Sequence, residues 1–527
     1  MFSGENEKPE LIIGLVGPAG VRLRDVSKVL TEHLKLFGYT AETIRISKLF
    51  EECRGYDKNK SQNGEGNRIV YCQEVALDFR RAINDGAAPA LAAIAEIRKS
   101  RAAEPSGNPD QSRNAHAYIL DQLKHPKEVE LLRQVYGSAF ILVAGHAPRT
   151  RRVDSLAKML ADDDGREVDG TYSGKAETII DIDESQSDDP DLGQNTRDTY
   201  PLADFFVDLT NEGGEGAVRR FINLIFGHPF ETPHRKEYAM HQAWAASMRS
   251  SDFNRQVGAV IVRHECNSSN SFLRDLNIVS TGMNEIPRGG GGLYWNDSSP
   301  DVRDQRLEAK DDDRAKKIKT SALAELLDRI KAAEWLNDNK SVEQPIHLAK
   351  ELLPLLNRTQ FMNIGEFSRP VHAEMAALID SARRGVAVQG LSMYVTTFPC
   401  HNCAKHIIAA GLKQVIYLEP YPKSRAENLH GEEIVLEAPE NKIYEDKVAF
   451  IAYTGVAPRQ YQRLFSMENR GKRRGIPLKV WEESMNILRP LYVIRNAAAS
   501  YLLNERKELK RLLKDVYKWD KETLCPD

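Results

Sequence analysis

Two short stretches decide how the second half of this chain folds: Pro370-Val371-His372-Ala373-Glu374 and Phe398-Pro399-Cys400-His401-Asn402-Cys403. A helix-like segment, Met375–Ser381, follows the first stretch, and the second stretch opens another predicted helix, Cys400–Ala410. Strands are predicted on either side of that second helix, at Leu391–Phe398 and Gln414–Leu418. This alternation indicates an α/β domain whose two motifs lie at helix starts.

The two stretches hold the residue types of a metal site. One histidine nitrogen and two thiolates suit Zn²⁺, and three protein ligands leave the fourth position open for a water molecule. Positions three apart on a helix put Cys400 and Cys403 on one face, and a helix start favours anionic sulfur. His372, Cys400 and Cys403 are therefore predicted to bind one catalytic zinc ion.

Each motif has a plainer interpretation when taken alone. H-x-E occurs by chance in many helices, and C-x-x-C can be a structural zinc half-site or a redox pair. In this order, H-x-E followed by P-C-x-x-C is typical of zinc-dependent nucleobase deaminases. Zinc lowers the pKa of bound water to about 7, and Glu374 is predicted to pass a proton from that water to the ring nitrogen and the leaving ammonia.

Three segments resemble deoxycytidylate deaminase: Ser251–Val260, Ser280–Gly289 and Leu391–Leu418. The resemblance implies a cytidine-deaminase-like α/β/α sandwich with a mixed sheet over residues 238–465. A charged segment at about 296–349 departs from the short members of the family and is expected to be a helical insertion.

The same resemblance implies two substrate-binding residues, Asn284 and Gln256. Asn284 would contact the sugar and phosphate side of the nucleotide. The alternative for Asn284 is a turn-forming role, because a proline and glycines follow it closely. Two strands, Gln256–Arg263 and Leu276–Gly282, are expected to form an antiparallel pair here, after a helix that starts near Tyr238.

The first 228 residues are predicted to form a parallel βα domain. An apolar run at Leu11–Val16, a glycine-containing turn and an amphipathic stretch at Val21–Phe37 indicate strand, loop and helix. Further strands are predicted at Thr43–Ile46, Ala117–Leu120, Ala139–Ala144 and Phe205–Val207. Residues 161–194 are rich in Asp, Gly and Ser and are expected to form an exposed loop or lid-like insertion.

The loop after the first strand resembles an incomplete phosphate-binding loop. Its candidate nucleotide-binding residues are Gly14, Gly17 and Gly20, together with Asp121 at the end of a later strand. A Walker A loop read from Gly17 needs glycine, lysine and Ser/Thr at 22–24, where this chain has Arg22, Leu23 and Arg24. Of three alternatives, we therefore favour a domain that binds a nucleotide effector. The others are an active nucleotide kinase and a domain that only packs against the C-terminal half. For Asp121, a helix cap is the alternative.

A second resemblance covers nearly the whole chain: the two-domain bacterial antiphage deoxycytidylate deaminases, in which a P-loop-like domain precedes the deaminase. It rests on the domain order and on three segments, Leu120–Pro126, Glu419–Ser424 and Gly455–Arg459. It implies conversion of dCMP and dCTP to dUMP and dUTP, which drains the dCTP pool during phage infection. A housekeeping dCMP deaminase that supplies thymidylate synthesis is the alternative.

Composition narrows the partners. The net charge of −3, from 73 basic and 76 acidic residues, gives no global reason to expect a nucleic acid. The basic cluster Arg470–Arg474, in a helical tail over residues 466–527, is the one local support for an RNA- or DNA-binding editing protein. Partners are expected to be deoxycytidine nucleotides, further copies of the chain and an inhibitory RNA or protein.

The cellular setting is expected to be the cytoplasm. The six cysteines do not form a disulfide framework, since Cys400 and Cys403 are the one closely spaced pair. The first ten residues, MFSGENEKPE, are polar and acidic and lack the positively charged start and the apolar run of a signal peptide. No apolar run in the chain approaches the length of a membrane span.

Overall fold

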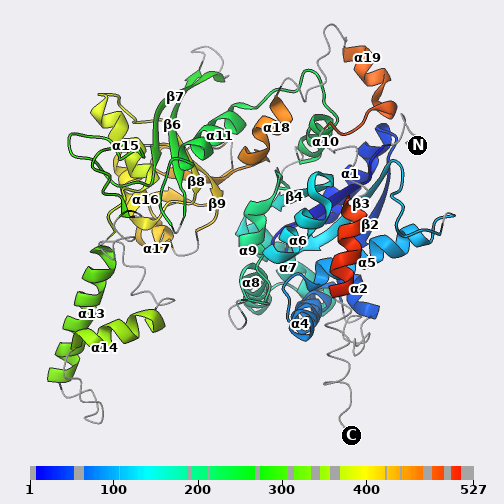
Figure 1. Ribbon diagram of the computed structural model, residues 1–527, viewed down its shortest axis with the longest axis horizontal. Coiled ribbons are helices and arrows are strands. Elements are labelled where there is room, and N and C mark those ends of the chain that lie inside the picture. Colours follow the sequence, from blue (N-terminus) through cyan, green and yellow to red (C-terminus); the bar gives the residue numbers. More distant parts are fainter. Residues whose placement is uncertain are drawn as a thin grey trace.

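The computed structural model contains two α/β domains, each built on its own six-stranded sheet (Figure 1). The residues that it describes are 8–52, 64–105, 107–186, 189, 191–210, 214–253, 255–266, 273–304, 306, 314–333, 345–356, 368–421, 424–439, 442, 444–466, 478–491 and 500–511. The basic cluster at 470–474 lies outside them. Among the described helices, none has the length and apolar character needed to cross a membrane.

The N-terminal sheet has the strand order β12-β5-β4-β1-β3-β2. All neighbouring strands run parallel except β12, which is antiparallel to β5. The strands are β1 (Leu11–Val16), β2 (Thr40–Arg45), β3 (His116–Leu123), β4 (Phe140–His146), β5 (Phe205–Asp208) and β12 (Gly455–Val456). The predicted parallel sheet is confirmed, with strand ends shifted by a few residues.

Helices connect these strands in the order expected for crossover units. They are α1 (Leu23–Leu36), α2 (Ile46–Leu49), α4 (Glu65–Ile83), α5 (Ala88–Ala102), α6 (Pro126–Tyr136), α7 (Arg149–Asp163), α8 (Gly170–Glu184), α9 (Thr196–Thr199) and α10 (Gly214–Ile225). Helix α1 packs against α10, and α5 packs against α6. Because right-handed crossovers set the side, these two pairs cover opposite faces of the sheet.

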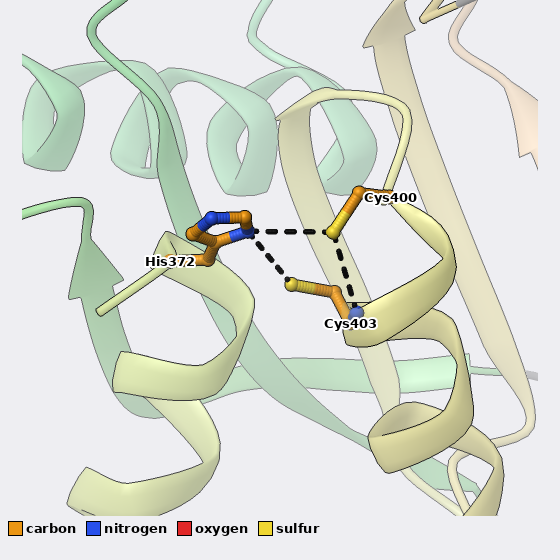
Figure 2. Close-up of side chains that lie close together, drawn as sticks. All are labelled: His372, Cys400 and Cys403. Atoms are coloured by element: carbon orange, nitrogen blue, oxygen red, sulfur yellow. Dashed lines mark hydrogen bonds between the residues drawn. The ribbon is translucent and has the colours of Figure 1, made fainter. Parts of the chain in front are cut away.

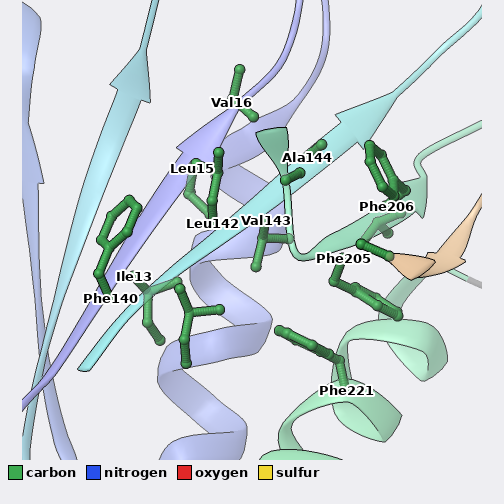
Figure 3. Packing of buried hydrophobic residues seen from close by; sticks show 14 of the residues in the cluster. Ile13, Leu15, Val16, Phe140, Leu142, Val143, Ala144, Phe205, Phe206 and Phe221 are labelled. Atoms are coloured by element: carbon green, nitrogen blue, oxygen red, sulfur yellow. The ribbon is translucent and has the colours of Figure 1, made fainter. Parts of the chain in front are cut away.

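The core of this domain follows from fully apolar central strands. All six residues of β1 are buried, as a parallel strand covered on both faces requires. Figure 3 shows Val143 of β4 beside Phe205 of the neighbouring strand β5, and the rings of Phe205 and Phe221 stack with their centroids 4.4 Å apart.

The expectation for residues 161–194 was wrong over most of its length. Residues 170–184 form helix α8, which packs on α7. Its buried residues, Tyr172, Ala176, Ile179 and Ile180, recur at helical spacing and form a small core with α7. The many charged residues between them concealed this narrow apolar stripe in the sequence.

The C-terminal sheet has the order β10-β11-β9-β8-β6-β7 and mixes both orientations. Strands β10, β11, β9 and β8 are parallel, whereas β8–β6 and β6–β7 are antiparallel, which confirms the predicted hairpin and the mixed sheet. The strands are β6 (Gly258–Cys266), β7 (Leu273–Met283), β8 (Ser392–Thr397), β9 (Gln414–Glu419), β10 (Ile434–Val435) and β11 (Val448–Ala452).

Alternating residues of this sheet face two different helical layers. Val260 and Ile416 belong to the core formed with α11 (Arg235–Ser247). Ala259 and Val415 belong to the core formed with α15 (Ala373–Arg383) and α16 (His401–Ala409). The domain is therefore a three-layer α/β/α sandwich that begins at α11, slightly before the predicted boundary at 238.

The predicted insertion is helical and projects from the C-terminal domain (Figure 1). Its helices are α13 (Arg314–Ala332) and α14 (Pro345–Leu352), which pack together around Leu323, Leu327 and Ala349. The remaining short helices are α17 (Ala426–His430), α18 (Tyr461–Phe465) and α19 (Leu478–Glu483).

The two domains share one continuous core. Strand β12, from the C-terminal half, pairs with β5 at the edge of the N-terminal sheet. Residues from both sheets belong to one buried cluster, including Val260 and Ile416 from one and Phe205 and Ile141 from the other. The predicted boundary at about residue 228 separates the two sheets along the chain, but the hydrophobic core continues across it.

The C-terminal helical residues 500–511 return to the N-terminal domain, where they complete a buried charge cluster. Arg101 is bound by Glu10 and Glu505 at 2.8 and 2.7 Å, and all three side chains are fully buried. Tyr501 donates a hydrogen bond to Glu10 at 2.8 Å.

Replacing Arg101 by methionine should destabilise the protein strongly, because two buried carboxylates would lose their counter-charge. We expect a loss of about 3 kcal/mol or more in the free energy of unfolding, measured by urea denaturation. Arg81→Met is the matched control, since Arg81 binds Asp189 at 2.9 Å at a more exposed site and should cost at most about 1 kcal/mol. Equal stability of the two variants would contradict this account.

Candidate active site

The first turns of α15 and α16 bring the three predicted zinc ligands together (Figure 2). His372 is the N-cap residue of α15 and Cys400 is the N-cap residue of α16. The Cys400 sulfur accepts a hydrogen bond from the backbone N–H of Cys403 at 3.5 Å. The helix start thus orients the two sulfurs on one side, as the C-x-x-C spacing predicts.

The geometry of these residues fits a tetrahedral zinc ion. The Nδ1 atom of His372 lies 3.4 Å from the sulfur of Cys400 and 3.4 Å from that of Cys403. With Zn–S of about 2.3 Å and Zn–N of about 2.0 Å, tetrahedral sulfur and nitrogen ligands lie about 3.5 Å apart. His372, Cys400 and Cys403 form a His/Cys/Cys group able to hold a metal ion in the described part of the chain.

Glu374 lies beside this group and is almost completely buried, with 4% of its surface exposed. Burial, followed by the negative charge of the Cys400 thiolate, raises the pKa of Glu374 to about 7. A cation held by the three ligands lowers the pKa of a neighbouring carboxylate again. The position of this buried carboxylate beside the three ligands suits a general acid and base.

A glycine that the sequence analysis missed sets the position of α15. A Cβ atom on Gly282 of β7 would lie only 2.1 Å from the carbonyl oxygen of Ala373 and 2.4 Å from the backbone nitrogen of Ala377. The strand and the helix therefore touch backbone to backbone, directly behind His372 and Glu374. A glycine at the end of the predicted strand Leu276–Gly282 is the signal that could have identified this contact.

Asn284 fixes the chain beside the site. Its side chain is 8% exposed and accepts a hydrogen bond from the backbone N–H of Val257 at 2.7 Å while donating to the carbonyl of Arg255 at 2.8 Å. Both of these bonds are internal to the protein. Gln256 is exposed, and its amide donates to the carbonyl of Ser250 at 2.8 Å. The substrate contacts of Asn284 and Gln256 stay predictions.

The sequence analysis also missed a buried ion pair next to Asn284. Glu285 is 2% exposed and accepts a hydrogen bond from the hydroxyl of Ser251 at 2.8 Å. Arg303, at the start of the insertion, lies 3.7 Å from Glu285 and binds Asp301 at 2.8 Å. This pair anchors the first residues of the insertion to the loop that carries Asn284.

The candidate nucleotide-binding residues of the N-terminal domain fall into two groups. Gly14 lies inside β1 against the side chains of Leu123 and Phe140, so packing accounts for its lack of a side chain. The carbonyl of Gly17 accepts a hydrogen bond from Lys124 at 3.0 Å. Gly20 and Asp121, in contrast, line a cavity.

Comparisons with known proteins identify the C-terminal region. Residues 233–419 match the family model described as the cytidine and deoxycytidylate deaminase zinc-binding region. Deoxycytidylate deaminase of Enterobacteria phage T4 is 44% identical over 55 residues, which cover 10% of this chain and 28% of the phage protein. Deoxycytidylate deaminase of Homo sapiens is 29% identical over 182 residues, which cover 34% of this chain and 63% of the human protein.

Among solved structures, the dCMP deaminase from cyanophage S-TIM5 in complex with dCMP and dUMP is 17% identical, covering 42% of this chain and 99% of that one with a TM-score of 0.22. The chain thus aligns with less than two thirds of the length of these curated relatives. Residues 233–419 are thus similar to the zinc-binding region of cytidine and deoxycytidylate deaminases. The relatives that this region matches are deoxycytidylate deaminases, so the region is deoxycytidylate deaminase-like.

Replacing Gly282 by alanine should displace α15 and so separate His372 and Glu374 from the two cysteines. We expect reduced zinc content by elemental analysis and a fall of about 100-fold in deamination rate, because small misplacements of reacting groups are costly. Gly289→Ala is the control, since nothing lies within 4 Å of a Cβ atom there. Full zinc and full activity in Gly282→Ala would show that the backbone contact does not position the site.

Proposed function

We propose that this chain is a cytoplasmic zinc-dependent enzyme that hydrolytically deaminates deoxycytidine nucleotides, converting dCMP and dCTP to dUMP and dUTP with release of ammonia. The observation that carries this proposal is the meeting of His372, Cys400 and Cys403 at metal-ligand distances beside the buried carboxylate of Glu374. The names of the relatives, deoxycytidylate deaminases, support the choice of nucleotide.

Each residue of the site then has a defined role. His372, Cys400 and Cys403 hold zinc, which when bound supplies a nucleophile by lowering the pKa of water. Glu374 accepts one proton from the attacking water and delivers it to the pyrimidine ring nitrogen. It then takes the second proton from the same oxygen and delivers it to the amino group, which leaves as ammonia. Asn284 and Gln256 are proposed to bind the substrate, with Asn284 on the sugar and phosphate side of the nucleotide.

The N-terminal domain is proposed to be a P-loop-like regulatory domain that binds a nucleotide effector. Support comes from a direct contact between the domains: the backbone N–H of Arg149, at the start of α7, donates to Glu437 of the deaminase-like domain at 2.5 Å. Helix α7 also contacts the loop after β1, because Arg152 packs against Gly20. A change at that loop can therefore reach the deaminase-like domain through one helix.

The biological role proposed for the activity is depletion of dCTP in antiphage defence, which the resemblance to the two-domain enzymes supports. Such an enzyme would harm its own cell if unrestrained, so an inhibitory RNA or protein partner and assembly into a homo-oligomer are part of the proposal. The proposed cytoplasmic setting is consistent with the metal site, because the thiols of Cys400 and Cys403 must remain reduced to bind metal.

Replacing Glu374 by glutamine should leave zinc bound and abolish turnover. The amide keeps the shape of the side chain but cannot shuttle a proton, so we expect ammonia release to fall by a factor of about 10²–10⁴ at unchanged zinc content. Glu432→Gln is the control, because Glu432 is exposed on the same domain. Normal turnover by Glu374→Gln would exclude the proposed proton transfer.

The substrate is tested with a panel of all common ribo- and deoxynucleotides, and with oligonucleotides, incubated with the full chain and analysed by chromatography. We expect dCMP and dCTP alone to lose their amino group. Turnover of dCMP without dCTP would favour thymidylate supply over dCTP depletion. Deamination confined to oligonucleotides would overturn the proposal in favour of an editing enzyme.

A further inference from the structure

A cavity of about 380 Å³ lies in the N-terminal domain, at the carboxyl ends of β1, β2 and β3. Its wall includes Gly20 from the loop after β1, Arg45 at the end of β2 and Asp121 near the end of β3. Strands β1 and β3 are neighbours, but the helices that follow them cover opposite faces of the sheet. Parallel α/β sheets bind ligands in the crevice that forms at such a point.

The inner wall of this cavity holds buried polar atoms that no described residue satisfies. They are Oε1 of Gln73, Oε1 of Gln194, Oδ1 of Asp121, and Nε and Nη1 of Arg80. Gln73, Arg80 and Gln194 are 6, 1 and 4% exposed. Leaving a buried polar group without a hydrogen-bond partner destabilises the folded state. Four such side chains around one cavity therefore indicate a ligand that supplies matching donors and acceptors.

Apolar side chains complete the same inner wall. Residues of this kind from α2, α4 and α7, and from the turn that follows α2, line it: Ile46, Phe50, Ile69, Leu156 and Met159. A flat ligand part with polar edges, such as a nucleobase, fits a space that combines apolar faces with amide and guanidinium groups.

A second cavity, of about 440 Å³, continues outward from the first and shares Arg24, Arg45 and Asp121 with it. Its wall adds Lys28 and Lys48, so basic side chains predominate there. Clustered Arg and Lys side chains attract phosphate groups and hold them by charge-assisted hydrogen bonds.

The loop after β1 is already engaged with the protein's own carboxylate. Asp183 of α8 accepts a hydrogen bond from the backbone N–H of Ala19 at 2.9 Å and binds Lys124 at 2.8 Å. This loop amide, which a phosphate-binding loop would offer to a phosphate, therefore faces an anion of the chain itself. The basic outer cavity is the better place for the phosphates of a ligand.

We propose that the joined cavities bind a nucleoside phosphate with its base in the inner cavity, its sugar hydroxyl donating to Asp121, and its phosphates at Arg24, Arg45 and Lys28. The binding of a nucleotide here is inferred from the cavities alone. That this nucleotide regulates the enzyme rests on the effector role proposed above. The base enters first and the phosphates stay outside, so the loop after β1 does not cradle them.

The test is isothermal titration calorimetry of the full chain with ATP, dGTP, dTTP and dTMP, and with inorganic tripolyphosphate and nucleosides as partial ligands. We expect at least one nucleotide to bind, and Arg45→Ala to weaken it by about tenfold or more, as the loss of a hydrogen bond to a charged group predicts. Gln73→Leu should change the preference among bases. Arg151→Ala, an exposed arginine on α7 outside both cavities, should leave binding unchanged.

Two results would overturn the inference: equal nucleotide affinity in the wild type and Arg45→Ala, or competition by tripolyphosphate as strong as that of the nucleotide. The second result would mean that the inner cavity contributes nothing to the affinity for the nucleotide. Thermal unfolding of each variant establishes that it is folded. Deamination of dCMP by the wild type and by Arg151→Ala tests the deaminase proposal, and nucleotide binding by the inactive Glu374→Gln variant tests this one without turnover, so the two failures are distinguishable.

Discussion

The distance between the first turns of α15 and α16 is the constraint on which the site depends. The histidine comes from one helix and both thiolates from the other, and the three atoms must meet within a few ångströms to share one ion. Strand β7 supports α15 through Gly282, where backbone touches backbone. The sheet therefore acts as the rigid frame that holds two helix starts at a fixed separation, and the buried carboxylate of Glu374 is placed by the same contact.

Polar contacts join the domain that carries this site to the N-terminal domain. Asp204, just before β5, binds Arg459 at 3.2 Å and Gln460 at 2.8 Å, and Arg220 of α10 binds Glu237 of α11 at 2.8 Å. These polar contacts surround the shared hydrophobic core and the added strand β12. The two sheets thus form one continuous body, which is the physical condition for an effector site in one domain to influence the other.

The grouping of His372, Cys400 and Cys403 and most strands were predictable from the sequence because both signals are local. A C-x-x-C at a helix start and a run such as Leu11–Val16 carry their meaning within a few residues. Contacts between distant segments were not predictable in this way. Three such contacts join residues far apart in the sequence: the pairing of β12 with β5, the ion pair of Glu505 with Arg101, and the hydrogen bond of Asp183 with Ala19. Asp183 also lies in a charged segment that was expected to be a loop.

Hydrolysis at the site of His372, Cys400, Cys403 and Glu374 places an oxygen atom from water in the base of the product. The full chain with bound zinc is incubated with dCMP or dCTP in ¹⁸O-labelled water, and the deoxyuridine nucleotide is analysed by mass spectrometry. The account predicts one labelled oxygen in the base for each ammonia released. Release of ammonia without labelled product, or recovery of unchanged dCMP and dCTP, would contradict it.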